Sequence, residues 1–421
     1  MMGDWRETTL GGVCNEVSGV IQTGPFGSQL HQSDYSPSGI PVVMPKDIIE
    51  GRIDAESVAR VSMEHVERLS RHKLRSGDIV YGRRGDIGRQ ALIRQEQEGW
   101  MCGTGCLRLS LGDSVLNPLF LHYYLRQDDV VSWITNQAVG ATMPNLNTGI
   151  LRSVPVKFPT LQVQQRIASI LSTYDELIEN SQRRIKILES IARALYREWF
   201  VNFRFPGHEN HPLVASSLGE IPQGWEVKRV TDAVHLNPRV VIPREGEKPF
   251  VPMGCLANNS MIITDIESRT GNSGAKFQNG DTLFARITPC LENGKTGFVQ
   301  FLPDANAVAF GSTEFIVLRS RSLTPEFVYC LARSDDFREV AIKSMSGASG
   351  RQRVQEQCLN DLEIAEPSRV LLDKFSAMVS PSFRLIYKLQ KQVQNLRRTR
   401  DLLLPRLLSG QSMPVYVGER S

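Results

Sequence analysis

The sequence predicts an α+β protein built from two similar globular domains of mixed helix and strand, separated by two long antiparallel helices that form a coiled coil. Three observations support this fold class. The chain repeats itself, each copy begins with short β-rich runs, and each copy ends in a long segment with a heptad repeat of apolar residues. At 421 residues the chain is too long for one hydrophobic core, so at least two domains are expected.

The internal repeat has a period of about 208 residues. The stretch GDIVYGRRG from Gly77 returns as GDTLFARIT from Gly280. The stretch NPLFLHYYLRQDDV from Asn117 returns as TPEFVYCLARSDDF from Thr324. Further matches keep the same order along the chain, which chance does not readily produce. A pseudo-twofold internal repeat is therefore predicted.

Each copy begins with about 150 residues of short β-rich runs that Gly and Pro interrupt. Examples are IPVVM, DIVYG and CLRLSL in the first copy and DTLFARI, TGFVQFL and EFIVLRS in the second. A helix is expected after Asn117 and after Thr324, because Pro118 and Pro325 suit the first helical turn. Each globular domain is therefore predicted to combine strands with short helices.

The long helical segments carry the clearest periodicity of the chain. In each segment apolar residues recur in alternating steps of four and three, which indicates a coiled-coil seam, with Ser382 and Arg400 as polar exceptions. Such a helix needs a partner to bury its seam, and the helix of the other copy is the expected one. Packing of each helix on its own globular domain is the alternative. The predicted interface residues are Ile167, Leu171, Ile178, Ile185, Leu188 and Leu195 in the first segment and Phe375, Val379, Ile386, Leu389, Val393, Leu396 and Leu403 in the second.

These patterns predict six consecutive parts of the chain. They are a first globular domain (1–158), a first long spacer helix (159–203), a linker (204–224), a second globular domain (225–367), a second long spacer helix (368–410) and a C-terminal tail (411–421). The linker is rich in Pro, Gly and His, so His208 and His211 are interpreted as loop composition rather than as metal ligands.

Composition and motifs argue against several classes of protein. The chain has no GxxxxGK[ST] phosphate loop, no GxSxG elbow and no HExxH motif, so catalytic residues, a directly bound cofactor and a metal site are not expected. No CxxC pair and no membrane-length apolar run are present, so we expect a cytoplasmic protein with reduced thiols and no membrane contact. A net charge of +4 is compatible with nucleic acid without demanding it.

Two similar but unequal globular domains on a rigid spacer suit a bipartite, asymmetric target. Double-stranded DNA offers such targets, because half-sites on one face of the duplex lie about 34 Å apart and a helical rod can set their spacing. Since the two copies differ in their loops, the two half-sites can differ as well. The alternative is a coiled-coil scaffold that does not bind DNA and has two ligand-binding heads.

The sequence resembles a known family, the specificity subunits of type I restriction–modification systems. The resemblance covers essentially the whole chain. It rests on TGPFGSQLH from Thr23, GIPVV from Gly39, SGDIVYGRRGDIGR from Ser76, FPTLQVQQRIASIL from Phe158 and GEIPQGW from Gly219. Together, in order and partly duplicated, these stretches are a strong signal.

The resemblance implies two target-recognition domains and an assembly with other subunits. These would be two modification (methyltransferase) subunits, which carry S-adenosylmethionine, and restriction subunits, which are ATP-dependent translocases and cleave DNA. The specificity subunit itself would have no active site. The second copy departs from the pattern, because HLNPRVVIPREGEKPF from His235 stands where the first copy has GPFGS. Type IIB enzymes use similar subunits, so the mode of cleavage stays open.

The candidate DNA-binding residues lie in polar loops of each copy. Arg can contact phosphates or read guanine bidentately in the major groove, and Gln, Thr, Ser and Asn are adaptable donors and acceptors. A solvated turn is the alternative for the arginine loop of the first copy, and a flexible loop tip is the alternative for SGASGRQR in the second. The candidates are Gln22, Thr23, Ser28, Gln29, Arg83, Arg84, Arg89, Thr142 and Asn145 in the first copy and Arg286, Thr288, Lys295, Ser349, Arg351 and Arg353 in the second.

The outer faces of the long helices are a further candidate surface. Their basic residues, such as Arg183, Arg184 and Lys186, are most simply a solvated face. The end of the first long helix, near Trp199 and Phe200, is expected to be exposed and offers an alternative docking point for the modification subunits.

Overall fold

The chain folds into two compact units. The computed structural model describes residues 5–56, 58–85, 87–138, 145–348 and 350–409. Unit 1 comprises Met1–Glu176 with Leu396–Ser421, and unit 2 comprises Leu177–Asn395. Each unit thus contains one globular domain and one part of each long helix.

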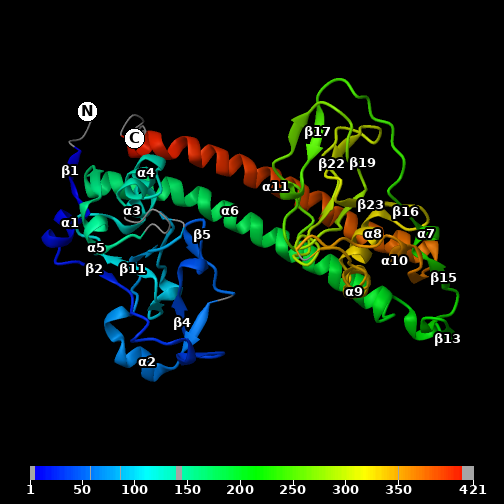
Figure 1. Cartoon of the computed structure of the whole chain (residues 1–421), viewed down its shortest axis with the longest axis horizontal. Coiled ribbons are helices and arrows are strands. Elements are labelled where there is room, and N and C mark those ends of the chain that lie inside the picture. The colour runs from blue at the N-terminus through cyan, green and yellow to red at the C-terminus, as the bar shows by residue number, and fades with distance from the viewer. Residues whose placement is uncertain (1–4, 57, 86, 139–144, 349, 410–421) are drawn as a thin grey trace, which may run out of the picture. The chain divides into compact units, whose positions relative to one another are not determined.

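The two long helices, α6 (Leu161–Tyr196) and α11 (Arg369–Leu408), run antiparallel. In unit 1 the beginning of α6 packs on the end of α11, since Ile167 and Leu171 share a core with Leu407. In unit 2 the later part of α6 packs on the earlier part of α11, where Ile185 shares a core with Leu389. Figure 1 shows the two ribbons side by side. The predicted fold class, with its antiparallel coiled coil, is confirmed.

Burial follows the heptad pattern along both helices. Half-buried members are Leu188, Leu195, Leu396 and Leu403. The helices also pack on their own globular domains, because Phe383 of α11 contacts Phe298 and Tyr329 with ring centroids 5.0 and 5.4 Å apart. The fully buried members are Ile167, Leu171, Ile178, Ile185, Phe375, Val379, Ile386, Leu389 and Val393.

Unit 1 contains two four-stranded sheets. One has the order β2-β11-β8-β9, and the other has the order β10-β4-β7-β3, in which β10 and β4 are parallel. A separate antiparallel pair joins the first strand of the domain, β1, to the last, β12, with Arg6 opposite Phe158. The strand bounds are β1 (Arg6–Thr9), β2 (Val20–Thr23), β3 (Tyr35–Ser36), β4 (Ile40–Val43), β5 (Ile48–Ile49), β6 (Arg52–Ile53), β7 (Ala59–Val61), β8 (Ile79–Gly82), β9 (Gln90–Leu92), β10 (Met101–Cys102), β11 (Cys106–Ser110) and β12 (Pro155–Phe158).

Unit 2 repeats this plan. Its sheets have the orders β16-β23-β20-β21 and β18-β17-β22-β19, in which β17 and β22 are parallel, and β15 pairs with β24 with Glu226 opposite Glu366. A hairpin of β13 (Leu213–Ser216) and β14 (Gly219–Pro222) lies in the predicted linker. The other strands are β15 (Glu226–Arg229), β16 (Val234–Leu236), β17 (Lys248–Val251), β18 (Glu267–Arg269), β19 (Ala275–Phe277), β20 (Thr282–Ala285), β21 (Thr296–Phe298), β22 (Ala309–Gly311), β23 (Phe315–Ser320) and β24 (Glu363–Glu366).

Four of the five short helices of unit 1 have counterparts in the same order in unit 2, and α2 has none. In unit 1 they are α1 (Leu10–Glu16), α2 (Met63–Arg68), α3 (Pro118–Tyr124), α4 (Asp128–Gln137) and α5 (Thr148–Ser153), and in unit 2 they are α7 (Val230–Ala233), α8 (Pro325–Arg333), α9 (Asp335–Lys343) and α10 (Gln357–Asn360). The predicted helix starts are present in both copies. Asn117 and Thr324 cap α3 and α8, where their side chains accept hydrogen bonds from Phe120 N and Phe327 N.

One glycine recurs at the same place in both copies because its conformation demands it. Gly77 and Gly280 both have φ +88°, and each lies against the proline that opens the following helix, Pro118 or Pro325. A side chain is disfavoured at such a φ, so the shared glycine keeps the approach to β8 and β20 alike.

The aromatic end of α6 is buried in unit 2. Trp199 and Phe200 lie in a π-helical turn (Arg197–Val201) and are 5% and 7% exposed. Phe200 contacts Phe327, Phe375 and Trp225 with ring centroids 4.8, 5.0 and 6.0 Å apart. The prediction that this end is exposed is wrong, because aromatic residues from three other segments of unit 2 cover it.

Candidate nucleic-acid interface

The loops that follow β8 and β20 hold their first arginine in the same way. Arg83 N donates to Gly105 O (2.8 Å) and Arg83 O accepts from Leu146 N (2.9 Å). Arg286 N donates to Glu314 O (3.0 Å) and Arg286 O accepts from Val354 N (2.8 Å). The two arginines are therefore structurally equivalent.

The next residue of each loop forms an isolated bridge with a second polar loop. Arg84 is bridged to Asn145, and Ile287 is bridged to Arg353. In each unit, two loops that were predicted separately from the sequence are thus brought together. Asn145 and Arg353 occupy equivalent places, yet one is an amide and the other a guanidinium.

In unit 1 the arginine loop presents basic side chains to solvent. Arg83 is half-buried, and its Nε donates to Leu146 O (3.2 Å). Arg84 and Arg89 are exposed, and the side chain of Arg84 has no partner among the residues that the structure describes. Thr142, the remaining candidate of the second loop, lies outside the described residues.

The TGPFGSQLH segment uses part of its polar groups for its own fold. Gln22 Nε2 donates to Arg71 O (2.6 Å), and Gln29 Oε1 accepts from Phe26 N (3.1 Å). Thr23 is half-buried at the end of β2. Ser28 is exposed beside Phe26, which is 56% exposed. Ser28 is therefore more accessible to a ligand than either glutamine.

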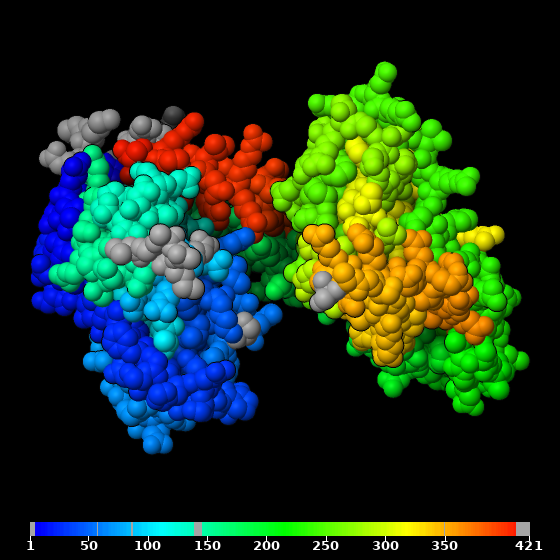
Figure 2. Space-filling view, in the orientation of Figure 1, coloured from blue at the N-terminus to red at the C-terminus, as the bar shows by residue number. Residues whose placement is uncertain are grey.

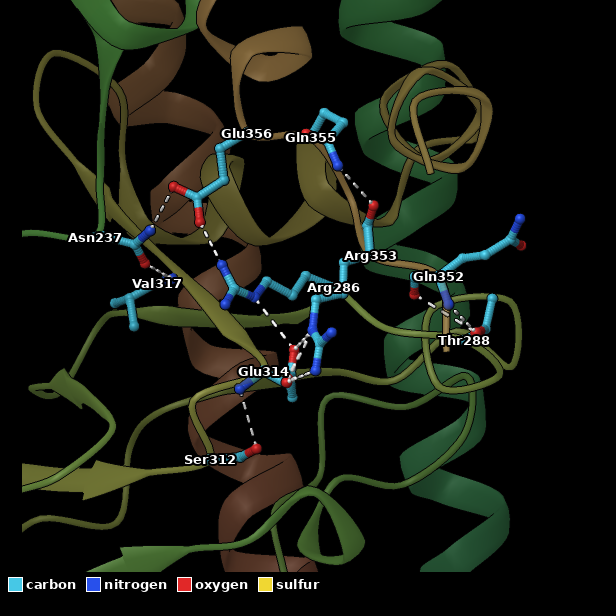
Figure 3. A network of polar contacts seen from close by, with 10 residues as sticks. All are labelled: Asn237, Arg286, Thr288, Ser312, Glu314, Val317, Gln352, Arg353, Gln355 and Glu356. Carbon is cyan, nitrogen blue, oxygen red and sulfur yellow. Dashed lines mark hydrogen bonds and ion pairs between the residues drawn. The ribbon is translucent and has the colours of Figure 1, made fainter. Parts of the chain in front are cut away.

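In unit 2 the equivalent arginines lie in a network of ion pairs (Figure 3). Glu314 accepts from Arg286 Nε (3.3 Å) and from Arg353 Nη2 (2.7 Å). Arg286 Nη1 also donates to Glu356 (2.7 Å), whose other oxygen accepts from Asn237 Nδ2 (3.0 Å). Two guanidiniums and two carboxylates thus balance one another at this place.

The glutamates of this network did not emerge from the sequence. The hydrogen bond from Arg353, with a smaller contribution from the charge of Arg286, holds the pKa of Glu314 below its usual range, so this carboxylate stays ionised. Arg353 has 49% of its side chain exposed and Arg286 has 28%. The guanidinium of Arg353 is therefore the more accessible of the two, and Glu314 holds it in place.

The remaining candidates of unit 2 lie around the same network. Thr288 Oγ1 accepts from Gln352 N (3.0 Å), which ties the two loops together. Lys295 Nζ donates to Met253 O (3.0 Å) and so supports the fold. Arg351 is exposed, and its side chain has no partner among the described residues. Figure 2 shows this part of the second globular domain in orange, on the face toward the viewer. Ser349 lies outside the described part of the chain.

The segment after β16 replaces the GPFGS loop of the first copy. It contains Val241, which is 93% exposed. Together with β19 and β23 it borders a pocket of about 650 Å³ whose lining includes Arg239, Lys276 and Arg286. The basic residues Arg239 and Lys276 were missed from the sequence, because they lie far apart in the chain and outside the repeated motifs.

The described residues contain neither a metal-binding cluster nor a helix suited to span a membrane. Among residues 5–56, 58–85, 87–138, 145–348 and 350–409, no group of three His, Cys, Asp or Glu side chains could hold a metal ion. Within those residues no helix has both the length and the apolar character that a membrane span requires.

Comparisons with known proteins give a consistent result. A family model described as the type I restriction modification DNA specificity domain matches residues 2–190. The MjaIX specificity subunit of a type I restriction enzyme from Methanocaldococcus jannaschii is 26% identical over 90% of this chain and 88% of its own length. The HindI specificity subunit from Haemophilus influenzae is 20% identical over 97% of this chain and 100% of its own length. The first part of the chain thus matches a DNA specificity domain, and the chain as a whole is similar to specificity subunits of type I restriction enzymes.

A solved structure has the same fold as this chain. The S subunit from M. genitalium superposes with a TM-score of 0.58 at 17% identity, over 99% of this chain and 97% of that one. The family model ends at residue 190, whereas the similarity to the MjaIX and HindI subunits extends over most of the chain and so includes unit 2. The matched family model describes a DNA specificity domain and the relatives are named specificity subunits, so the comparisons support a role in DNA sequence recognition rather than in catalysis.

Proposed function

We propose that this chain is a specificity subunit and recognises a bipartite, asymmetric DNA target, with one half read by each globular domain. The observation that carries the proposal is the paired loops after β8 and β20. Both units bring the same two loops together through the same backbone hydrogen bonds, but they equip them with different side chains: Arg84 and Asn145 in one, Ile287 and Arg353 in the other. A shared framework with unlike contact residues suits the reading of two unlike half-sites.

The proposed domains follow the boundaries expected from the sequence. The target-recognition domains are residues 1–158 and 225–367, and the spacer helices lie within 159–203 and 368–410. The proposal assigns to α6 and α11 the role of a spacer, because each helix continues from one unit into the other without interruption. Such a helix pair resists compression and bending over a few turns, so its length would set the distance between the half-sites.

The partners in the proposal come from the family. The relatives are subunits of type I restriction enzymes, so this subunit would direct modification subunits, two in number, and restriction subunits to the DNA that it has recognised. Methyl transfer from S-adenosylmethionine and ATP-dependent DNA cleavage would take place on those partners.

Two matched substitutions test the proposal. Arg84→Ala and Arg351→Ala each remove one exposed guanidinium, one from each unit, and neither side chain has a partner among the described residues, so folding should not change. If these arginines read bases, each substitution should cost about 1–3 kcal/mol of discrimination in one half-site only. The measurement is the affinity of the complex with its modification subunits for duplexes in which either half of the target is scrambled. Relaxation of the same half by both substitutions would contradict the proposal.

A further inference from the structure

Unit 2 contains a basic pocket that lies apart from the loops discussed above. Its volume is about 370 Å³, and its lining residues come mainly from the end of α6, the end of α8 and the beginning of α9. These helices are labelled in Figure 1. Ser334 follows α8 and caps α9, where its Oγ accepts from Phe337 N (3.4 Å). The lining includes four arginines: Arg193 and Arg197 from α6 and the turn that follows it, Arg333 from α8 and Arg338 from α9.

Three of these arginines have a buried donor without an acceptor. Arg333 is only 6% exposed; it donates through Nη1 to Gly294 O and through Nη2 to Asn259 Oδ1 (3.3 Å). Its Nε is buried and has no hydrogen-bond partner among the described residues, and the same holds for Nε of Arg193 and of Arg338. Because these three Nε atoms are buried from water, a ligand in the cavity would not reach them directly, but the guanidiniums to which they belong contribute positive charge to the lining.

The four arginines around the pocket outnumber the three nearby carboxylates, which are Asp335, Asp336 and Glu189. Asp335 and Asp336 are exposed at its rim, and Asp335 lies 3.6 Å from Arg197. Glu189, behind the pocket, accepts from Ser260 Oγ and Met261 N. Burial, and then the nearby charge of Arg333, lower the pKa of Arg338, as expected where like charges gather away from water.

We propose that this pocket binds the phosphate group of a small molecule, either inorganic phosphate or a nucleotide. Arginine donors match phosphate oxygens well, and the N-terminus of α9 adds a favourable dipole. The cavity volume is at the lower end of the range for small-molecule sites, which suits a ligand of this size. The acidic rim disfavours a longer acidic peptide.

The pocket is linked to the candidate DNA interface by the arginines themselves. Arg338 Nη2 donates to Leu291 O (3.2 Å) and Glu292 O (3.3 Å), and Arg333 holds Gly294. These carbonyls lie between Thr288 and Lys295 in the sequence. A phosphate attracted by the charges of these arginines would fix the guanidiniums and hence this loop. The binding site itself does not depend on the proposed DNA-binding function.

Titration calorimetry of the purified full chain tests the proposal. Inorganic phosphate and AMP are titrated separately at constant ionic strength, and saturable binding of one ligand per chain is expected for at least one of them. Tighter binding of AMP would identify a nucleotide as the source, and binding of inorganic phosphate at least as tight would identify the free ion.

Two charge additions on α6 locate the site. Ala194 is exposed and lines the pocket, whereas Ile191 is exposed and lies outside its lining. Ala194→Glu should weaken phosphate binding about tenfold or more through like-charge repulsion. Ile191→Glu, with the same added charge, should leave binding within about twofold. Failure of both ligands to saturate, equal weakening in both variants, or displacement of the ligand by a DNA duplex would overturn the proposal.

Discussion

A single backbone position separates the two units most sharply. Gly105 occupies it in unit 1, with φ +85° and no side chain, and Glu314 occupies it in unit 2. The carboxylate of Glu314 pairs with both Arg286 and Arg353 and thereby neutralises the basic character that the sequence of that loop suggests. The same backbone thus supports a cationic loop in one unit and a charge-balanced one in the other.

Replacing Glu314 tests this difference. Glu314→Gln keeps a hydrogen-bond acceptor but removes the charge, so Arg286 and Arg353 become available to DNA phosphates. We expect tighter binding to non-specific duplexes and a plot of log affinity against log salt that is steeper by about one unit. The measurement is fluorescence anisotropy over a range of salt concentrations.

The matched control is Glu339→Gln. Glu339 pairs with Lys343 on the exposed face of α9 and has 60% of its side chain exposed. The substitution therefore removes the same charge at a place outside the network. An equal change in the salt dependence of both variants would show that net charge, rather than the Glu314 network, is responsible.

The sequence could predict the positions of these arginines but not their partners. The repeat placed Arg286 opposite Arg83, and the basic composition of SGASGRQR pointed to Arg353. Glu314 lies 28 residues from Arg286 and 39 residues from Arg353 in the sequence. Glu356 lies 70 residues from Arg286. Such pairings depend on how strands are ordered in the sheet, which no local pattern states.

The polar exception in the seam of α11 has a structural explanation within unit 1. Arg400 Nη1 donates to Asp175 Oδ1 of α6 (2.5 Å), and Tyr123 Oη donates to Asp175 Oδ2 (2.8 Å). Burial opposes the charged form of Asp175, but these hydrogen bonds outweigh it and lower the pKa of this carboxyl. A charged pair therefore joins the two helices and the head where the heptad pattern breaks.

Removing Arg400 should destabilise unit 1 strongly. Arg400→Ala leaves Asp175, with 12% of its side chain exposed, without its closest cation, and the expected loss is about 3–5 kcal/mol in the free energy of unfolding. Arg397→Ala is the control on the same helix. Arg397 pairs with Glu50 at the surface, so its loss should be within about 1 kcal/mol. Chemical denaturation measures both, and comparable losses would contradict the assigned role of the Arg400–Asp175 pair.

The heptad pattern predicted the helix pair, but it did not predict which helix faces pack on the globular domains. Seam residues recur at fixed steps, so their burial follows from periodicity. Phe383 lies beside the seam and packs on Phe298 and Tyr329, which the period does not show. Trp199 and Phe200 were expected at an exposed helix end, whereas tertiary contacts with residues such as Phe327 bury them.

The duplicated chain as a whole suits the asymmetric target that we propose. The strand order of one sheet and the helix starts are shared by both copies, while the loops at equivalent places have diverged. If the helices set the spacing between the half-sites, changing their length should change the preferred target in a predictable way.

A paired deletion tests the spacer role of the helices. Removing one heptad from each helix, residues 177–183 and 391–397, keeps the seam in phase because seven residues are lost from both sides. Each helix shortens by about 10 Å, so the preferred spacer between the half-sites should shorten by about three base pairs. Selection from duplexes with spacers of different lengths measures the change. An unchanged spacer, with the folded state confirmed by circular dichroism, would show that the helices do not set the distance.

The most direct test of two-domain recognition is the methylated DNA motif that this chain specifies. The chain is expressed with its modification subunits in a host without other methylation systems, and the modified sites are read by single-molecule sequencing. Two short specified segments separated by a spacer of unspecified bases are expected, with Arg84→Ala relaxing one segment and Arg351→Ala relaxing the other. A single uninterrupted motif, or a motif that persists without this chain, would contradict the account.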